Sequence, residues 1–119
     1  MKKFAMMVMM IVMVAAMPAA AAEKKTVIPN SMFAEIVEDI ESDTEEMVDD
    51  KQYEEVYVTA RKSEVDYQAQ TGSWSVLWDN GDHVIVTIED GEIKIDYKEG
   101  YMTVLAECSL MEYYESEIE

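Results

Sequence analysis

Two residue types that often carry chemistry occur only once each in the sequence. His83 follows Asp82, but a zinc site or a catalytic dyad would need further imidazoles or a nucleophile, and the neighbouring residues supply neither. We therefore expect His83 to be a surface residue at the end of a hairpin. The acidic neighbours Glu107 and Glu112 disfavour a thiolate at Cys108, so we expect a buried, unreactive thiol there.

Carboxylates are abundant, but their pattern does not define a site. The turn Asp79–Asp82 gathers oxygen ligands, yet it lacks the closing bidentate Glu that calcium loops commonly carry, and its Asn-Gly pair is accounted for by a hairpin. Glu89–Glu92 is a weaker instance of the same pattern. Among 26 acidic residues some pair will always stand at the spacing that glycosidases use, so such a pair has no predictive value. We expect no metal, no cofactor and no enzymatic activity.

Four aromatic residues are expected to share one end of an apolar sheet face: Trp74, Trp78, Tyr67 and Tyr97. Core packing beneath a helix is the favoured interpretation. Because one helix cannot cover a wide sheet fully, part of this cluster could instead form an open pocket for a sugar, a lipid or a peptide.

The charge of the chain is the strongest compositional signal. Of 119 residues, 26 are acidic and 9 are basic, which gives a formal net charge of −17. This charge argues against nucleic-acid binding, which needs a basic surface, and against adhesion to anionic lipid. From Glu35 to Glu55 there are eleven acids and one base, Lys51, and we expect all the acids to point outward or into the following turn. The candidate residues for binding a cationic protein are Glu38, Glu41, Glu45 and Glu46.

Residues 1–22 have the pattern of a secretion signal that is removed. Lys2 and Lys3 precede an uncharged apolar run, Pro18 breaks it, and three alanines form a small-residue cleavage site before Glu23. An uncleaved membrane anchor is the alternative, because residues 4–22 approach the length of a membrane span. We favour cleavage, which predicts a secreted or periplasmic protein with no stable membrane association.

The remaining 97 residues carry 26 acids against 7 bases. We divide them into a short polar leader, 23–30, and a single domain, 31–119. In the domain, Asn30 or Ser31 can cap the first turn of an amphipathic helix. Its apolar stripe comprises Phe33, Ile36, Val37, Ile40, Thr44, Met47 and Val48. Ser42 with Glu45 could form a second capping box, where the helix would break and restart.

The rest of the domain has the pattern of an antiparallel meander, with strands expected at 64–70, 73–78, 82–89, 92–98 and 101–108. We expect two-residue turns at Thr71-Gly72, Asp90-Gly91 and Glu99-Gly100, and a three-residue loop at Asp79–Gly81. A two-residue Asn80-Gly81 turn would place the apolar residues of adjacent strands on opposite faces. Four cross-strand pairs represent the expected register: Val76 with Val84, Val86 with Ile95, Tyr97 with Met102, and Val65 with Trp78.

Two segments of the domain leave alternatives open. Residues 53–60 are either a separate strand or the first half of a long strand that is bulged near 61–63. Residues 109–119 suit a final helix or a frayed strand, and we favour a short helix. The expected fold is α+β, with one amphipathic helix packed on an antiparallel meander of about five strands.

These patterns favour a small, secreted or periplasmic, non-enzymatic binding or inhibitory protein that recognises a cationic protein partner. The alternative is a small-ligand binder that uses the aromatic sheet face, and a small hydrolase is the least favoured hypothesis. The two sheet edges could pair chains, so the oligomeric state is open. No family motif is apparent, and this outline hosts many functions.

Overall fold

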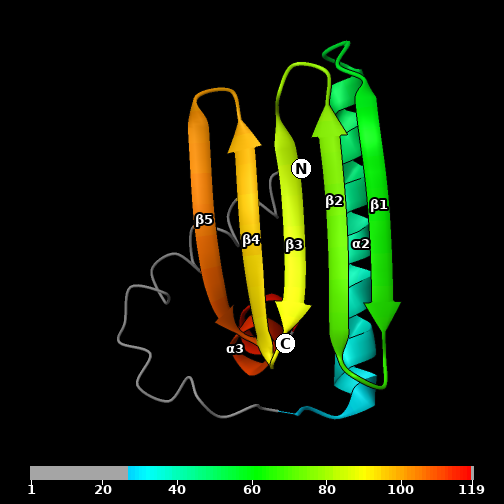
Figure 1. Cartoon of the computed structure of the whole chain (residues 1–119), viewed down its shortest axis with the longest axis vertical. Helices are drawn as coiled ribbons and strands as arrows, with labels where there is room; N and C mark the ends of the chain where they lie inside the picture. Colours follow the sequence, from blue (N-terminus) through cyan, green and yellow to red (C-terminus); the bar gives the residue numbers. More distant parts are fainter. Residues whose placement is uncertain (1–26, 119) are drawn as a thin grey trace.

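The computed structural model describes residues 27–118, and it places helices on one face of a five-stranded antiparallel sheet (Figure 1). The expected signal peptide lies outside the described residues, as does the first half of the leader. In chain order the elements are α2 (Asn30–Gln52), β1 (Val58–Asp66), β2 (Thr71–Trp78), β3 (His83–Glu89), β4 (Glu92–Glu99), β5 (Met102–Ser109) and α3 (Leu110–Glu117). The α+β meander expected from the sequence is confirmed, and so is the short C-terminal helix.

The longer helix, α2, is continuous, so the break expected near Ser42 does not occur. It begins directly after Pro29, whose carbonyl oxygen accepts hydrogen bonds from the backbone N–H groups of Met32 and Phe33. The expected side-chain cap is absent from this described helix, because the Asn30 carboxamide oxygen instead accepts a hydrogen bond from Gln70 at 2.9 Å. In Figure 1, α2 runs behind β1 and β2, and α3 lies near the lower ends of β4 and β5.

The two central strand pairs have the expected register. Val76 lies opposite Val84 and Val86 lies opposite Ile95. Gly81 adopts a φ of 94° in the three-residue loop, a left-handed conformation that glycine tolerates without strain. The strands β2, β3 and β4 therefore present one continuous apolar face to the core, as the alternation of their residues predicts.

The expected registers of the two outer pairs are wrong, although the residues that remain in these strands keep their expected faces. Val65 lies opposite Gly72, not Trp78, because the β1–β2 loop spans 67–70 and Gln70 supplies the positive φ there. Tyr97 lies opposite Val104, not Met102, because Gly100 is the first central residue of the β4–β5 turn and Tyr101 is the second.

The bounds of β1 and the position of its bulge differ from those expected from the sequence. Residues 58–66 form one strand, and its single irregularity lies at Thr59, between Val58 and Ala60, not near 61–63. Every residue of this strand except Val58 and Val65 is exposed. The outer strand β1 is therefore held mainly by its backbone bonds to β2.

The hydrophobic core lies between the inner face of the sheet and the two helices. Its largest fully buried side chains are Tyr113, Phe33, Ile36, Ile40, Ile88, Ile93, Ile95, Leu110, Val37 and Val76. The opposite, outer face has no described helix over it, and Ile85, Leu77 and Leu105 lie on it among polar residues. Among the described residues, no helix is both long enough and apolar enough to cross a membrane.

Candidate functional site

The four candidate partner-binding residues all lie on α2, and all are exposed. We call Glu38, Glu41, Glu45 and Glu46 the acidic helix surface. They lie outside the buried stripe that faces the sheet, and Glu41 and Glu45 are on the flank of α2 next to β1. Glu45 forms an ion pair with Arg61 of β1, whereas no basic residue of the described chain pairs with the other three. The surface thus presents mostly uncompensated negative charge to solvent.

The expectation that every acid of this segment points outward is wrong for Asp43. Its side chain is buried with the apolar stripe, since it lies three residues after Ile40 and seven after Ile36 on the same helical face. Asp39 is half-buried, and its carboxylate accepts a hydrogen bond of 2.8 Å from the Tyr113 hydroxyl of α3. The lower part of α2 therefore uses some of its acidic residues for internal structure.

The helix α3 is positioned for that contact by its own N-terminus. The Ser109 hydroxyl accepts a hydrogen bond from the Glu112 backbone N–H, and the Glu112 carboxylate accepts one from the Ser109 backbone N–H, which completes a capping box. The Tyr114 hydroxyl also reaches the Glu35 carboxylate, at 3.4 Å. Burial and the Asp39 charge raise the pKa of Tyr113 well above its ordinary value, so the hydroxyl remains a hydrogen-bond donor.

The four aromatic candidates do not form one open cluster. Trp74, Trp78 and Tyr97 are buried in the core, as the favoured interpretation expected. Tyr67 lies in the β1–β2 loop, is 48% exposed, and contacts the Phe33 ring edge-on at a centroid distance of 5.7 Å. Among the described residues, the indole N–H groups of Trp74 and Trp78 are buried without a hydrogen-bond acceptor. These rings therefore contribute packing and offer no open aromatic surface.

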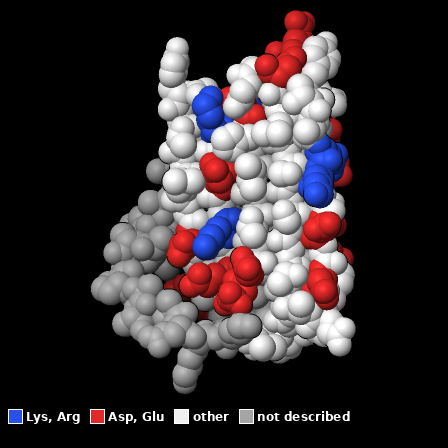
Figure 2. Space-filling view, viewed as in Figure 1, with Lys and Arg blue, Asp and Glu red and all other residues white. Residues whose placement is uncertain are grey.

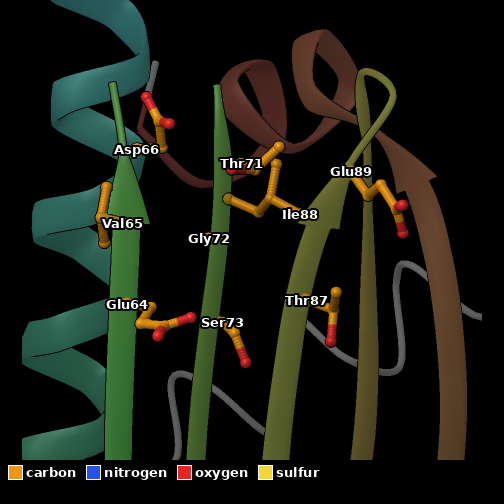
Figure 3. A pocket seen from close by; sticks show the side chains of 9 residues that line it. All are labelled: Glu64, Val65, Asp66, Thr71, Gly72, Ser73, Thr87, Ile88 and Glu89. Atoms are coloured by element: carbon orange, nitrogen blue, oxygen red, sulfur yellow. The ribbon is translucent and has the colours of Figure 1, made fainter. Parts of the chain in front are cut away.

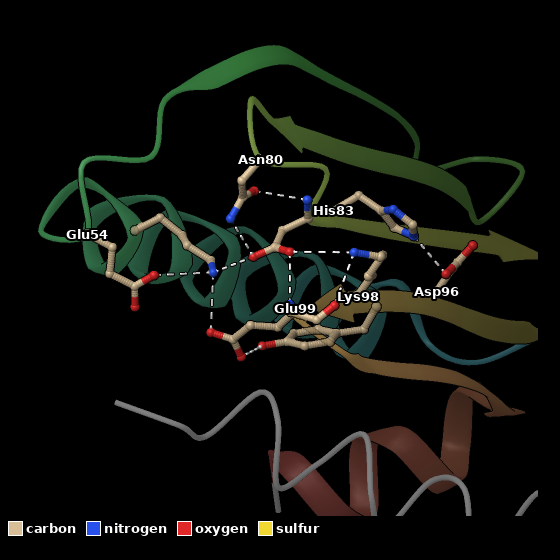
Figure 4. A network of polar contacts seen from close by, with 10 residues as sticks. Glu54, Asn80, His83, Asp96, Lys98 and Glu99 are labelled. Atoms are coloured by element: carbon tan, nitrogen blue, oxygen red, sulfur yellow. Dashed lines mark hydrogen bonds and ion pairs between the residues drawn. The ribbon is translucent and has the colours of Figure 1, made fainter.

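A buried polar network joins the C-terminal end of α2 to two loops of the sheet (Figure 4). The Lys51 ammonium donates to Asp82 Oδ2 at 2.6 Å and lies 3.4 Å from Glu99 and 3.5 Å from Glu54. The side chains of Lys51 and Asp82 are only 8% and 3% exposed. The ion pair thus fixes the end of the helix against the β2–β3 loop.

Asp82 is also the centre of the loop contacts. Its Oδ1 accepts a hydrogen bond from the Gly100 backbone N–H at 2.9 Å, and its Oδ2 accepts one from the Asn80 side chain at 3.1 Å. Lys98 lies 3.8 Å from Oδ1. The Asp82 carboxylate thus accepts three hydrogen bonds and lies near a second ammonium group, so it is engaged in contacts within the protein.

The network shifts the pKa of both members of its central pair. Burial alone lowers the pKa of Lys51, but the hydrogen bond and the charge of Asp82, aided by Glu99 and Glu54, outweigh burial and raise it. Burial alone raises the pKa of Asp82, but the donors Lys51, Gly100 and Asn80 outweigh burial and lower it. Both groups are therefore charged across the neutral range.

The single histidine, His83, and the single cysteine, Cys108, lie on the sheet faces expected from the sequence. His83 is on the outer face of the sheet, and its Nε2 is 2.9 Å from Asp96 Oδ1. Cys108 is buried on the inner face, and burial together with the charges of Glu112, Glu92 and Glu107 raises its pKa to about 12. The two side chains are thus on opposite faces of the sheet and form no catalytic pair.

Described residues form two shallow grooves on the outer face. One, of about 510 Å³, crosses β1, β2 and β3 near the end of the sheet that holds Asp66 and Glu89 (Figure 3). Glu64, Ser73 and Thr87 form a single cross-strand row along it, and Asp66 and Glu89 lie nearer the end. The other, of about 430 Å³, lies over β3, β4 and β5. Figure 2 views this face and shows basic and acidic side chains scattered over a larger uncharged area.

The described part of the chain, residues 27–118, holds no group of three or more His, Cys, Asp or Glu side chains arranged to bind a metal ion. The comparisons with protein-family models, with curated proteins and with solved structures find no match to this chain. The described surface features are the acidic helix surface and the outer face of the sheet.

Sequence reasoning missed the Lys51–Asp82 network. The sequence pattern marks Lys51 only as the single base of an acidic segment and Asp82 only as part of a turn. The two residues are 31 positions apart, and no local pattern links them. The one available signal was that Lys51 is the single base among eleven acids between residues 35 and 55.

Proposed function

We propose that this protein is a small, secreted or periplasmic, non-enzymatic binding or inhibitory module that recognises a cationic protein through the acidic helix surface. The observation that carries the proposal is the exposure of four glutamates on one face of α2, where only Glu45 has a basic partner among the described residues. The secreted or periplasmic location rests on the pattern of residues 1–22 alone.

The dense negative charge favours fast and selective association with a basic protein. Like charges at this density repel one another and destabilise the fold, and solubility alone needs a smaller net charge. A basic partner relieves that repulsion when it binds. Opposite fields raise the association rate and suppress wrong partners, while apolar contacts supply the lasting affinity.

The small-ligand alternative receives no support from the aromatic residues. Trp74, Trp78 and Tyr97 are buried in the core and present no open aromatic face. A hydrolase is equally unsupported, because His83 and Cys108 face opposite sides of the sheet. We therefore propose only the binding module.

The proposal is tested by charge reversal at two places on the same chain. Proteins are first captured from the compartment with the immobilised processed chain, and we expect the captured proteins to have a high pI. The variant Glu38→Lys, Glu41→Lys, Glu46→Lys leaves the Glu45–Arg61 ion pair intact. We expect it to slow association with the captured protein by about tenfold or more at low salt, with little change in the dissociation rate.

The matched control reverses the exposed acids Glu64, Glu89 and Glu107 on the sheet and changes the net charge by the same amount. It should slow association much less. If both triple variants slow association equally, net charge acts and not the acidic helix surface. If the captured proteins are neutral or acidic, the proposal fails.

A further inference from the structure

The two edges of the sheet differ in how well they resist pairing with another strand. The β1 edge carries an irregularity at Thr59 and the adjacent bases Arg61 and Lys62, and these features discourage strand addition. The β5 edge has none of these features. Its eight residues pair with β4 in unbroken register, and Glu107 is the only charged residue among them. No described strand covers this edge.

The backbone groups available at this edge follow from the β4–β5 turn. The two residues that flank a two-residue turn form two backbone hydrogen bonds with each other, so Met102 is hydrogen-bonded to Glu99. Every second residue of β5 after Met102 is then hydrogen-bonded to β4 in the same way. The N–H and C=O groups of Thr103, Leu105 and Glu107 consequently point away from β4. They form a ready template for another extended chain.

Two of the side chains on this edge strand are apolar and exposed. Leu105 is 72% exposed and Met102 is 41% exposed. Leu105 also borders the groove of about 430 Å³ on the outer face, next to Ile85 and Asp96. An apolar residue this exposed at the centre of an unguarded edge gains burial when a strand adds there.

We propose that the β5 edge pairs antiparallel with the β5 edge of a second copy of this chain, about a two-fold axis at Leu105. This register uses all three pairs of outward backbone groups, because Leu105 meets its own counterpart and Thr103 meets Glu107. On the inner face it places Val104 opposite Ala106 and Met102 opposite Cys108. Every inner-face residue of β5 therefore meets an apolar residue of the other copy.

The charges of the chain are compatible with this pairing despite its large net charge. Glu107 lies opposite Thr103 of the second copy, and Thr103 pairs with Lys98 on β4, so Glu107 approaches a base and not its own counterpart. The acidic helix surface lies behind the β1–β2 side of the sheet (Figure 1), which is the side remote from β5. The two acidic surfaces would sit at opposite ends of a continuous ten-stranded sheet.

The oligomeric state of the processed chain tests the proposal directly. We expect a dimer in sedimentation equilibrium in the micromolar range under reducing conditions. Leu105→Lys should return it to a monomer, since that change places two like charges at the axis. Ala60→Lys makes the same charge change at an exposed position of the β1 edge and should leave the dimer intact. Circular dichroism of each variant establishes that it is folded.

Cysteine cross-linking tests the register on a Cys108→Ala background. Two Leu105→Cys residues would stand at about 5.5 Å between Cα atoms, within reach of a disulfide. Two Thr103→Cys residues would stand about 14 Å apart and could not be bridged. We expect oxidation to link the first variant and not the second.

Three outcomes overturn the proposal. A wild-type chain that stays monomeric shows that the edge does not pair with itself and leaves it open to a different chain. A dimer that survives Leu105→Lys, or that Ala60→Lys abolishes, lies elsewhere on the molecule. Linkage through Thr103→Cys but not through Leu105→Cys contradicts the two-fold axis at Leu105.

Discussion

Lys51 and Asp82 show how one buried ion pair can set the geometry of several loops. Taking both charges out of water is costly, so the pair is not by itself a source of stability. Its effect is positional, because Asp82 also receives the Gly100 backbone N–H and the Asn80 amide. The end of α2, the β2–β3 loop and the β4–β5 turn are thereby held at one point.

We expect Lys51→Met to destabilise the protein by about 3–5 kcal/mol, because it leaves the Asp82 carboxylate buried without its cation. Chemical denaturation at neutral pH measures the effect. Adding Asp82→Asn to Lys51→Met should recover part of the loss, since the buried charge is then removed. A double variant that is less stable than Lys51→Met alone would contradict this account.

The pH dependence of unfolding follows from the same two shifts. The lowered pKa of Asp82 contributes stability above its ordinary pKa of about 4, and the contribution is lost as the pH falls through the folded value. The raised pKa of Lys51 contributes stability below about 10, and the contribution is lost as the pH rises through the folded value. The difference between wild type and Lys51→Met should thus be widest between these limits.

At the scale of elements, the alternation of apolar and polar residues predicted which face of the sheet each residue occupies better than it predicted the register between strands. Each strand keeps its expected inner and outer residues because burial on one face fixes the parity of the whole strand. The register depends instead on which glycine makes the turn. Gly72 was assigned to a turn, but it lies in β2, where an added Cβ would come within 2.6 Å of the Trp74 ring. That close approach, and not chain reversal, requires glycine there.

Two neighbouring substitutions test the faces of β3. Val86→Asp should unfold the domain, since it places an unpaired charge in the fully buried face at a cost of several kcal/mol. Thr87→Asp, which lies on the outer face opposite Lys94, should change stability by less than about 0.5 kcal/mol. Thermal unfolding followed by circular dichroism separates the two. Reversed effects would mean that the faces are inverted.

At the scale of the whole molecule, the charge is unevenly distributed. Four of the five basic residues in the described chain belong to β1 or β4, whereas nine acids lie on α2. Composition alone indicated the excess of acids and the dense run between residues 35 and 55. It could not show that Lys51 is withdrawn into the protein, since that depends on a contact with a distant loop.

This self-repulsion predicts a salt dependence of stability. Raising the ionic strength from low to physiological should raise the melting temperature, because screening relieves repulsion among exposed acids while the buried Lys51–Asp82 pair is screened much less. The variant Glu38→Lys, Glu41→Lys, Glu46→Lys should show a smaller rise. An equal rise in the variant and the wild type would mean that these three glutamates do not cause the strain.

The strand order β1-β2-β3-β4-β5 also bears on how quickly the chain finds its structure. Each hairpin closes a short loop, so the sheet can form by successive local steps with little entropy lost to loop closure. The contacts that join distant parts, such as Tyr113 with Asp39 at 74 residues apart, fasten α3 to α2. A rapid phase in which the meander forms, followed by docking of α3, is the order of events that this topology favours.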